Sequence, residues 1–414
     1  MSQSHDSDMH GADLERGGSA GSREASTAAA GRVVAGTRKC TALVSIGRGP
    51  GDPRAMCKEA RSLAESGYEV TYVCNAESGP MITDDHVRIV AVHMPFSRLS
   101  RQLRGPGAML REALRSRPDV VHVFDPALIG PAVRLKRGSR VKVVADLAED
   151  NAKQILQKSY LGPMAVRKLA SHAYTLVSRR WLPQADLVIA ATPSIAESLP
   201  AGCRHIVVRN FPAIAEIDAV APLDLPATRS LTPVLRVAYV GGISPIRGVR
   251  EVLAAAGMLK GAVELHLAGQ VYDSRFLAEM ESMPAWKHCR YHGWLNWQDS
   301  IALVKACDVG ACIFQPAPNQ VEALPVKVFE YMACGRASII SWFPLWRRLF
   351  AGAALFVDPA EPASIARLME LLLAEPALLS RLAERGRLLA ETRFSWESEA
   401  RQLADGYAGL WTVR

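Results

Sequence analysis

Short apolar runs alternate with helical stretches through most of this 414-residue chain. CTALVSIG, YEVTYVCN, DVVHVFD, VKVVAD and ADLVIAAT are too apolar to have a solvent-exposed face, and helical segments, such as one expected at about 52–66, separate several of them. Strands that are buried on both faces and joined by helices are typical of a doubly wound parallel sheet. The alternation therefore predicts an α/β fold whose ligands bind beyond the carboxyl ends of the strands.

A proline-rich interruption at Pro222, Pro226 and Pro233 divides the alternation into two series. LRVAYVGG, VELHLAG, DVGACIF and ASIIS belong to the second series, so we expect two Rossmann-like domains with a binding cleft between them. The pattern predicts five parts: a disordered acidic tail at 1–37, an N-terminal Rossmann-like domain at 38–212, a linker at 213–233, a second Rossmann-like domain at 234–393, and a C-terminal helix at 394–414 that packs back on the first domain.

The positive charge of the chain is concentrated in the first domain. Residues 38–212 contain 26 Lys and Arg against 15 Asp and Glu, whereas 213–414 contain 20 against 21. No nucleic-acid-binding motif accompanies this charge, so we expect no nucleic acid partner, and the basic residues fit either an anionic membrane surface or solvated helix faces. The cysteine spacing indicates neither a zinc site nor a disulfide framework, and no secretory signal or membrane-spanning run is evident. We therefore expect a cytoplasmic protein, and peripheral contact with the inner face of the cell membrane stays one of the two open interpretations of its basic residues.

The most informative segment of the second domain is EALPVKVFEYMACG, which follows an apolar strand and a loop. Leu324, Pro325 and Val326 lie where its helix is expected to begin, with Pro325 at the first helical position. The free N–H groups and the positive end of the helix dipole can bind a diphosphate there without a metal, and Lys327 adds a cation in the first turn.

Two carboxylates flank this helix start. Glu330 can accept hydrogen bonds from the vicinal hydroxyls of a ribose, and Glu322, on the preceding loop, can reach a sugar at the other end of the diphosphate. By themselves, two carboxylates at this spacing are more often solvated or salt-bridged.

A glycine-containing turn, VGGISPIRG at 240–248, offers a second wall for the same ligand. Gly241 and Gly242 let the backbone approach a phosphate closely, and Arg247 can bind it with two hydrogen bonds. The Walker P-loop and the dinucleotide fingerprint are both absent, which argues against an ATPase or a dehydrogenase.

Together these motifs resemble those of the retaining, nucleotide-sugar-dependent glycosyltransferases of family four, which have the GT-B fold of two facing Rossmann-like domains. The resemblance rests on the E-x7-E pair, GGISPIRG, YHGW, ALPVKVFEYMACG and FPLW. In the first domain, DPRAMCKEARSLAESGYEV and VRNFP look like the branch that builds bacterial surface polysaccharides and lipopolysaccharides. The resemblance implies a nucleotide diphosphate sugar as co-substrate, no other cofactor, and a glycan or lipid-linked acceptor on the first domain.

The resemblance also implies roles for the second-domain residues. Glu330 would hold the ribose, and Glu322 would lie beside the donor sugar. Arg247 and Lys327 would neutralise the leaving diphosphate without a metal. Catalysis would then be electrostatic stabilisation of the leaving group and of an oxocarbenium-like centre.

Four first-domain residues are candidates for substrate binding because they lie near the carboxyl ends of strands: His122, Asp125, Asp146 and Glu149. A histidine that ends a buried strand is more often a core residue, and helix capping explains such carboxylates equally well.

The first domain also departs from the pattern of the family's branch. Ala148 stands where the branch has a histidine, and Phe124 and Ala127 replace two further polar groups. These losses keep open a non-catalytic relative that binds a nucleotide sugar and partners an active transferase. A phosphorylase or epimerase of the same fold is less well supported, because neither a cofactor-lysine pattern nor a histidine base is present.

Overall fold

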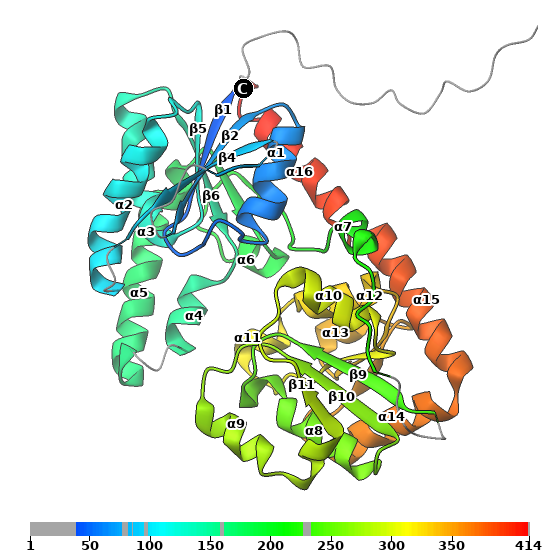
Figure 1. Cartoon of the computed structure of the whole chain (residues 1–414). Helices are drawn as coiled ribbons and strands as arrows, with labels where there is room; N and C mark the ends of the chain where they lie inside the picture. Colours follow the sequence, from blue (N-terminus) through cyan, green and yellow to red (C-terminus); the bar gives the residue numbers. More distant parts are fainter. Residues whose placement is uncertain are drawn as a thin grey trace, which may run out of the picture. The chain divides into compact units, whose positions relative to one another are not determined.

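The computed structural model describes residues 39–76, 82–84, 86–94, 98–157, 161–226 and 233–412. The predicted tail at 1–37 and residues 227–232 of the predicted linker lie outside the described residues. Lys39–Arg414 form one compact unit that contains two parallel sheets with helices on both faces (Figure 1). The predicted doubly wound α/β class is confirmed.

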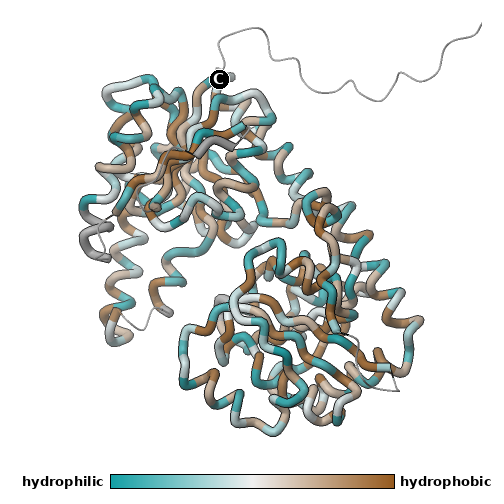
Figure 2. The backbone as a smooth tube through the Cα atoms, viewed as in Figure 1, coloured by the Kyte–Doolittle hydropathy of each residue, from teal (hydrophilic) through white to brown (hydrophobic). Residues whose placement is uncertain are grey.

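Within the described residues, the first sheet contains eight strands, and all its neighbouring pairs are parallel except β3 with β4. In spatial order they are β3 (Ile82–Asp84), β4 (Val87–Val92), β2 (Glu69–Asn75), β1 (Cys40–Val44), β5 (Val120–Val123), β6 (Lys142–Leu147), β7 (Leu187–Ala190) and β8 (His205–Val207). Alternate side chains of β1 enter separate cores: Val44 belongs to one and Leu43 to the other. Both faces are therefore buried, which explains the apolar sequences of these strands, brown in Figure 2.

The helices of this first lobe are η1 (Ala55–Ala60), α1 (Arg61–Glu65), α2 (Arg98–Leu114), α3 (Pro126–Leu135), η2 (Lys136–Gly138), α4 (Asn151–Gln157), α5 (Met164–Trp181), η4 (Leu182–Gln184) and α6 (Pro193–Glu197). The single helix predicted at about 52–66 is wrong in detail, because its first part, η1, is a π-helix. A π-helix aligns residues five apart. It thereby brings Arg54 and Glu59 to the same buried site, where they form an ion pair.

Six parallel strands form the sheet of the second lobe in the part of the chain that is described. Their spatial order is β11 (Cys289–Tyr291), β10 (Val263–Ala268), β9 (Leu235–Val240), β12 (Val309–Cys312), β13 (Ala337–Ser341) and β14 (Leu355–Val357). The strand order reverses between β9 and β12, and such a switch point opens a crevice at the carboxyl ends of the strands.

The helices of the second lobe are α7 (Ile214–Ala219), η5 (Pro245–Arg247), α8 (Val249–Met258), α9 (Ser274–Glu281), η6 (Pro284–His288), α10 (Trp297–Lys305), α11 (Pro318–Val321), α12 (Val326–Ala333), α13 (Pro344–Leu349), α14 (Pro362–Ala374) and α15 (Pro376–Arg393). Of these, α7 lies inside the segment that the sequence predicted as a linker. None of the helices in the described ranges is both long and apolar enough to cross a bilayer.

The chain returns to the first lobe through its last helix, α16 (Trp396–Ala408), red in Figure 1. Phe394 belongs to the core of the second lobe, and Trp396 belongs to the core of the first. The Trp396 backbone N–H donates to the Pro212 carbonyl at 2.8 Å, and its indole donates to Ser62 Oγ at 2.9 Å. The return crossing near residue 395 therefore lies beside the outward crossing near residue 212.

Candidate functional site

A cavity of about 890 Å³ lies at the carboxyl ends of the strands and takes lining residues from both lobes. The first lobe contributes loops that follow β1, β6 and β7, and the second lobe contributes loops that follow β9, β10 and β12 together with the start of α12. All nine second-domain candidates line it: Gly241, Gly242, Arg247, Glu322, Leu324, Pro325, Val326, Lys327 and Glu330. Of the four first-domain candidates, Glu149 lines the cavity, and His122, Asp125 and Asp146 do not.

The start of α12 places a buried amine at the cavity wall. Pro325 is the N-cap residue rather than the first helical residue, so α12 begins at Val326, one residue later than predicted. Lys327, in the first turn, is 8% exposed, and its Nζ lies 3.7 Å from the centroid of the Tyr239 ring. That Nζ has no hydrogen-bond partner among the described residues. Burial lowers the pKa of Lys327 to about 7.

The turn after β9 lies directly over this amine. Gly241 has φ +123°, and a Cβ there would lie 3.1 Å from Lys327 Nζ. A Cβ on Gly269, after β10, would lie 1.9 Å from the Gly241 carbonyl oxygen. Only glycine fits at either position, because both need a positive φ and close contact. Because glycine has no side chain, a ligand can approach the backbone closely at the ends of β9 and β10.

The rest of this wall is cationic and aromatic. The Arg247 guanidinium carbon lies 5.3 Å from the centroid of the Phe314 ring. A Cβ on Gly242 would lie 3.2 Å from Cε2 of Tyr272, so the absence of a side chain at position 242 leaves room for that ring. Arg247 and Lys327 thus supply two cations to one side of the cavity.

The two carboxylates of the E-x7-E pair have different surroundings. Glu330 Oε1 accepts a hydrogen bond from Trp297 Nε1 at 3.0 Å, which orients a half-buried carboxylate beside the cavity. Glu322 is exposed, and its Oε2 lies 3.4 Å from Nζ of Lys153 on α4 of the first lobe. Lys153 also pairs with Asp150 at 3.5 Å. An ionised carboxylate can accept several hydrogen bonds, so one that is held by a single donor can still accept hydrogen bonds from a ligand.

Two first-domain candidates serve the packing of the first lobe instead of the cavity. His122 is fully buried, its Nδ1 lies 2.8 Å from the Tyr407 hydroxyl, and burial lowers its pKa to about 4. Asp125 Oδ2 accepts hydrogen bonds from Ser45 Oγ at 2.8 Å and from the Ile46 N–H at 2.7 Å. The structure therefore corrects both assignments: His122 is held in the core by α16, and Asp125 fixes the loop after β1.

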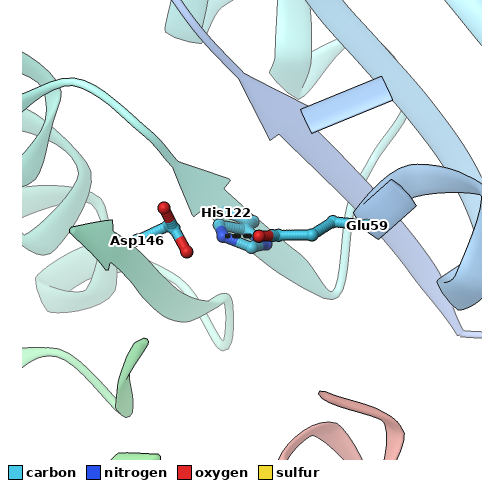
Figure 3. Close-up of side chains that lie close together, drawn as sticks. All are labelled: Glu59, His122 and Asp146. Atoms are coloured by element: carbon cyan, nitrogen blue, oxygen red, sulfur yellow. Dashed lines mark ion pairs between the residues drawn. The ribbon is translucent and has the colours of Figure 1, made fainter. Parts of the chain in front are cut away.

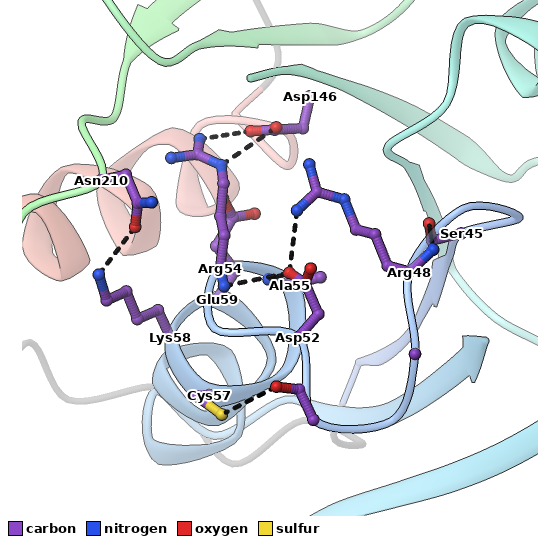
Figure 4. A network of polar contacts seen from close by, with 12 residues as sticks. Ser45, Arg48, Asp52, Arg54, Ala55, Cys57, Lys58, Glu59, Asp146 and Asn210 are labelled. Carbon is purple, nitrogen blue, oxygen red and sulfur yellow. Dashed lines mark hydrogen bonds and ion pairs between the residues drawn. The ribbon is translucent and has the colours of Figure 1, made fainter. Parts of the chain in front are cut away.

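Asp146 lies one layer behind the cavity and holds a residue that the sequence analysis missed. Arg54 donates from Nε and Nη2 to the two Asp146 carboxylate oxygens, at 3.2 and 2.6 Å (Figure 4). It also donates from Nη1 and Nη2 to the Val208 carbonyl at 3.1 Å. Arg54 lines the cavity although it is only 3% exposed. The role of Asp146 is therefore to position Arg54, not to contact a ligand.

Glu59 completes this buried group. Its Oε1 lies 2.9 Å from Arg54 Nε and its Oε2 lies 3.6 Å from His122 Nε2. Burial and the adjacent charge of Asp146 raise the pKa of Glu59 well above its usual value. Glu59, His122 and Asp146 offer atoms within 4.8 Å of one another, a spacing that suits a metal ion (Figure 3). Because the Arg54 guanidinium already contacts both carboxylates, we assign no metal to them.

Arg48 and Trp297 are further lining residues that the sequence analysis did not assign. Arg48 lies in the glycine-rich loop after β1, and Trp297 is the first residue of α10. Arg54 stands in the DPRAMCKEA run that supported the resemblance, and its place in that run was the available indication.

Comparisons with known proteins find two domain families and full-length relatives. The model of the glycosyl transferase 4-like domain matches residues 53–208, and the model of the glycosyl transferases group 1 matches residues 230–389. The lipopolysaccharide core biosynthesis glycosyltransferase LpsE of Rhizobium meliloti is 25% identical over 381 residues, which cover 88% of this chain and 96% of that protein. A glycogen synthase of Mycobacterium tuberculosis is 25% identical over 325 residues, which cover 72% of this chain and 73% of that protein.

Solved structures with the same fold are more distant in sequence. Sucrose-phosphate synthase from Thermosynechococcus elongatus has a TM-score of 0.70 at 16% identity, and the match covers 90% of this chain and 99% of that chain. Anabaena HepE in complex with UDP and glucose has a TM-score of 0.64 at 14% identity, over 90% of this chain and 99% of that chain. These likenesses show that the two sheets have the GT-B arrangement.

Proposed function

The chain belongs to the group 1 glycosyltransferases with the GT-B fold, and from that premise we propose that it transfers a hexose from a nucleotide diphosphate sugar to a glycan or lipid-linked acceptor, with retention of configuration and without a metal. The reaction would belong to bacterial surface polysaccharide or lipopolysaccharide synthesis, at the cytoplasmic face of the cell membrane. The observation that carries the proposal is the buried Lys327 amine, which lies at a helix start, beneath a glycine turn, and has no hydrogen-bond partner in the part of the chain that the structure describes.

The donor would bind along the second-lobe wall. The free N–H groups at the start of α12, Lys327 and Arg247 would surround the diphosphate, and Glu330 would accept hydrogen bonds from the ribose. Glu322 would lie beside the sugar, which requires it to exchange its contact with Lys153 for one with the donor.

The chemistry follows from where charge develops. When the bond between the sugar and the diphosphate breaks, negative charge grows on the diphosphate beside Lys327 and Arg247, and fixed cations stabilise it without reorganisation. The acceptor would enter from the first-lobe side, where Glu149 lines the cavity. Attack from the face that the diphosphate leaves would retain the configuration of the sugar.

A screen of sugar nucleotides tests this proposal. Purified protein is titrated with UDP-, GDP-, dTDP- and ADP-sugars by calorimetry, and release of the nucleoside diphosphate is measured with and without crude lipid and glycan acceptors. We expect one class of donor to bind and to release its diphosphate faster when acceptor is present. If no donor binds, the donor-site assignments are wrong.

One observation favours a second candidate, a non-catalytic protein that binds a nucleotide sugar and assembles with an active transferase. Ala148 lines the cavity where the family's branch has a histidine, so a polar group is missing from the acceptor side. Donor binding without turnover under every acceptor condition would support this candidate over the transferase.

We expect Glu330→Ala to weaken binding of the intact donor by about ten- to a hundredfold, because hydrogen bonds to a charged group contribute roughly 1.5–3 kcal/mol. Calorimetry with the sugar nucleotide found in the screen measures this change. Glu370→Ala, which removes an exposed carboxylate on α14, is the matched control and should bind the donor normally. An unchanged dissociation constant in Glu330→Ala would refute the ribose assignment.

Donor affinity is also expected to fall as pH rises above about 7. Because burial lowers the pKa of Lys327 to about 7, the free protein carries a neutral amine at pH 8, and an anionic donor must recruit a proton to it. Calorimetry at pH 8 in buffers of different ionisation enthalpy should therefore show uptake of about one proton per donor bound. Lys327→Met should abolish the uptake, and proton-neutral binding by the wild type would contradict contact between the amine and the donor.

A further inference from the structure

The second lobe contains a second cavity, of about 500 Å³, which shares no lining residue with the first cavity, the one of about 890 Å³ that both lobes line. Its lining comes from the end of α7 and the segment that follows it, from the C-terminal ends of α10 and α12, and from α15. The charged residues of this lining are Asp218, Lys305, Arg336 and Arg387. Three cations therefore face one carboxylate, and a cavity with an excess of positive charge attracts anions.

Two of the three cations are already hydrogen-bonded within the protein. Arg387 donates from Nη1 and Nη2 to the two Asp218 carboxylate oxygens, each at 2.8 Å, and from Nη1 to the Ala333 carbonyl at the end of α12. Lys305 Nζ donates to the Val220 carbonyl at 2.6 Å. The one carboxylate of the lining and these two carbonyls are thus paired with cations, so they offer little opposition to an incoming anion.

Arg336, the third cation, has a buried donor with no partner among the residues described. It follows Gly335, whose φ of +64° ends α12, and its side chain is half-buried. Its Nε is buried and has no hydrogen-bond partner in this part of the chain. A buried guanidinium N–H that lacks an acceptor costs free energy, and buried polar groups of native proteins are normally satisfied by protein, water or a ligand. An anion in the second cavity would supply the acceptor.

We propose that the second cavity binds a small phosphate monoester, such as a sugar phosphate, and that this ligand is an effector of the first cavity. The planar Arg336 guanidinium suits the oxygens of a phosphate, which it can bind with two parallel hydrogen bonds. Lys305 and Arg387 would add the long-range attraction of two further charges. A cavity of about 500 Å³ lies in the size range of small-molecule sites and leaves room for an organic group beside the phosphate.

The effector role follows from the two helices that connect the cavities. Helix α10 lines the first cavity with Trp297 and the second with Lys305, and α12 lines the first with Lys327 and the second with Ala333 (Figure 1). Because a helix moves as a rigid element, a ligand that shifts the C-terminal ends of α10 and α12 also shifts these first-cavity residues. This role rests on the proposed function, whereas binding to the second cavity does not. We expect the ester to change donor affinity by about threefold or more, and the donor to change ester affinity by the same factor.

Calorimetry with the full chain tests binding, first without any sugar nucleotide. The probes are glucose 6-phosphate and glycerol 3-phosphate, with inorganic phosphate and glucose for comparison. At least one ester should bind, more tightly than inorganic phosphate, and glucose should not bind. Arg336→Met should lower ester affinity by about tenfold or more, and Arg336→Lys, which keeps the charge without the planar group, should recover part of it. Arg385→Met, which removes an exposed cation of α15 outside the lining, is the matched control and should bind normally.

Lys327→Met decides between the two cavities, because the first cavity also contains cations. If ester affinity falls in Lys327→Met and not in Arg336→Met, the ester binds in the first cavity and the proposal is wrong. It is also wrong if neither ester binds, or if inorganic phosphate binds as tightly as the esters.

Titration of the sugar nucleotide found in the screen, with and without the bound ester, tests the effector role. Ester binding through Arg336 that leaves donor affinity unchanged would refute that role. If the esters bind through Arg336 but no sugar nucleotide binds, the proposed function fails and the second site stands. Urea unfolding should show no loss of stability in Arg336→Met, because the substitution removes a buried donor that has no partner among the described residues.

Discussion

Replacing Lys327 with methionine should lower the rate of nucleoside diphosphate release by about 10²–10³-fold, the usual effect of removing one preorganised group that stabilises developing charge. Methionine fills the space of the lysine stem and removes the amine, which has no hydrogen-bond partner among the described residues. The free energy of unfolding should therefore not fall. Turnover at saturating donor and urea unfolding of the same preparation measure the two quantities.

Lys58→Met is the matched control for this experiment. Lys58 is also buried, and burial lowers its pKa to about 8, but its Nζ donates to Asn210 Oδ1 and to the Phe211 carbonyl, each at 2.7 Å. Asn210 and Phe211 line the cavity, whereas Lys58 does not. We expect this variant to lose stability, because it leaves two acceptors without a donor, and to keep most of its turnover. A Lys327→Met protein with normal turnover would show that the amine does not act on the leaving diphosphate.

Asp146→Ala should destabilise the protein by about 3–5 kcal/mol, because it leaves the buried Arg54 charge without its closest partner. Urea unfolding followed by tryptophan fluorescence measures the loss. Removing both charges, with Arg54→Met and Asp146→Leu, should recover much of the stability, since paired burial of charge contributes little by itself.

The control for Asp146→Ala is Glu279→Ala, which removes the carboxylate of an exposed pair with Arg250. We expect it to cost less than about 1 kcal/mol. Equal losses in the two variants would mean that Asp146 is not the counter-ion that holds Arg54 in place.

The second-lobe lining of the cavity was predictable because one short stretch of sequence encodes most of it. The start of α12 fixes the positions of Lys327 and Glu330 by helical geometry, and the end of β9 fixes Gly241 and Gly242. From helix capping and the position of strand ends we therefore predicted that residues of these two segments lie on one wall of the cavity. In the structure all of them line the cavity.

The first-lobe assignments depended on distant contacts that local rules do not contain. His122 is the last residue but one of β5, and Tyr407, 285 positions later, covers it. Asp146 is the last residue but one of β6, and Arg54, 92 positions earlier, occupies its carboxylate. The π-helix that aligns Arg54 with Glu59 was not visible either, because the same residues suit an ordinary α-helix.

The late return of the chain to the first lobe has a consequence for biosynthesis. Trp396, Leu403, Tyr407 and Leu410 belong to the same core as Leu43 and Tyr72. A ribosome must therefore synthesise nearly the whole chain before the lobe that began first can complete its core. The second lobe, which is one continuous segment, has all its strands as soon as β14 emerges. Domains usually fold in the order in which they are synthesised. Here the second lobe can complete its fold first. Until α16 has been synthesised, the first lobe exposes an apolar groove that a chaperone is suited to cover.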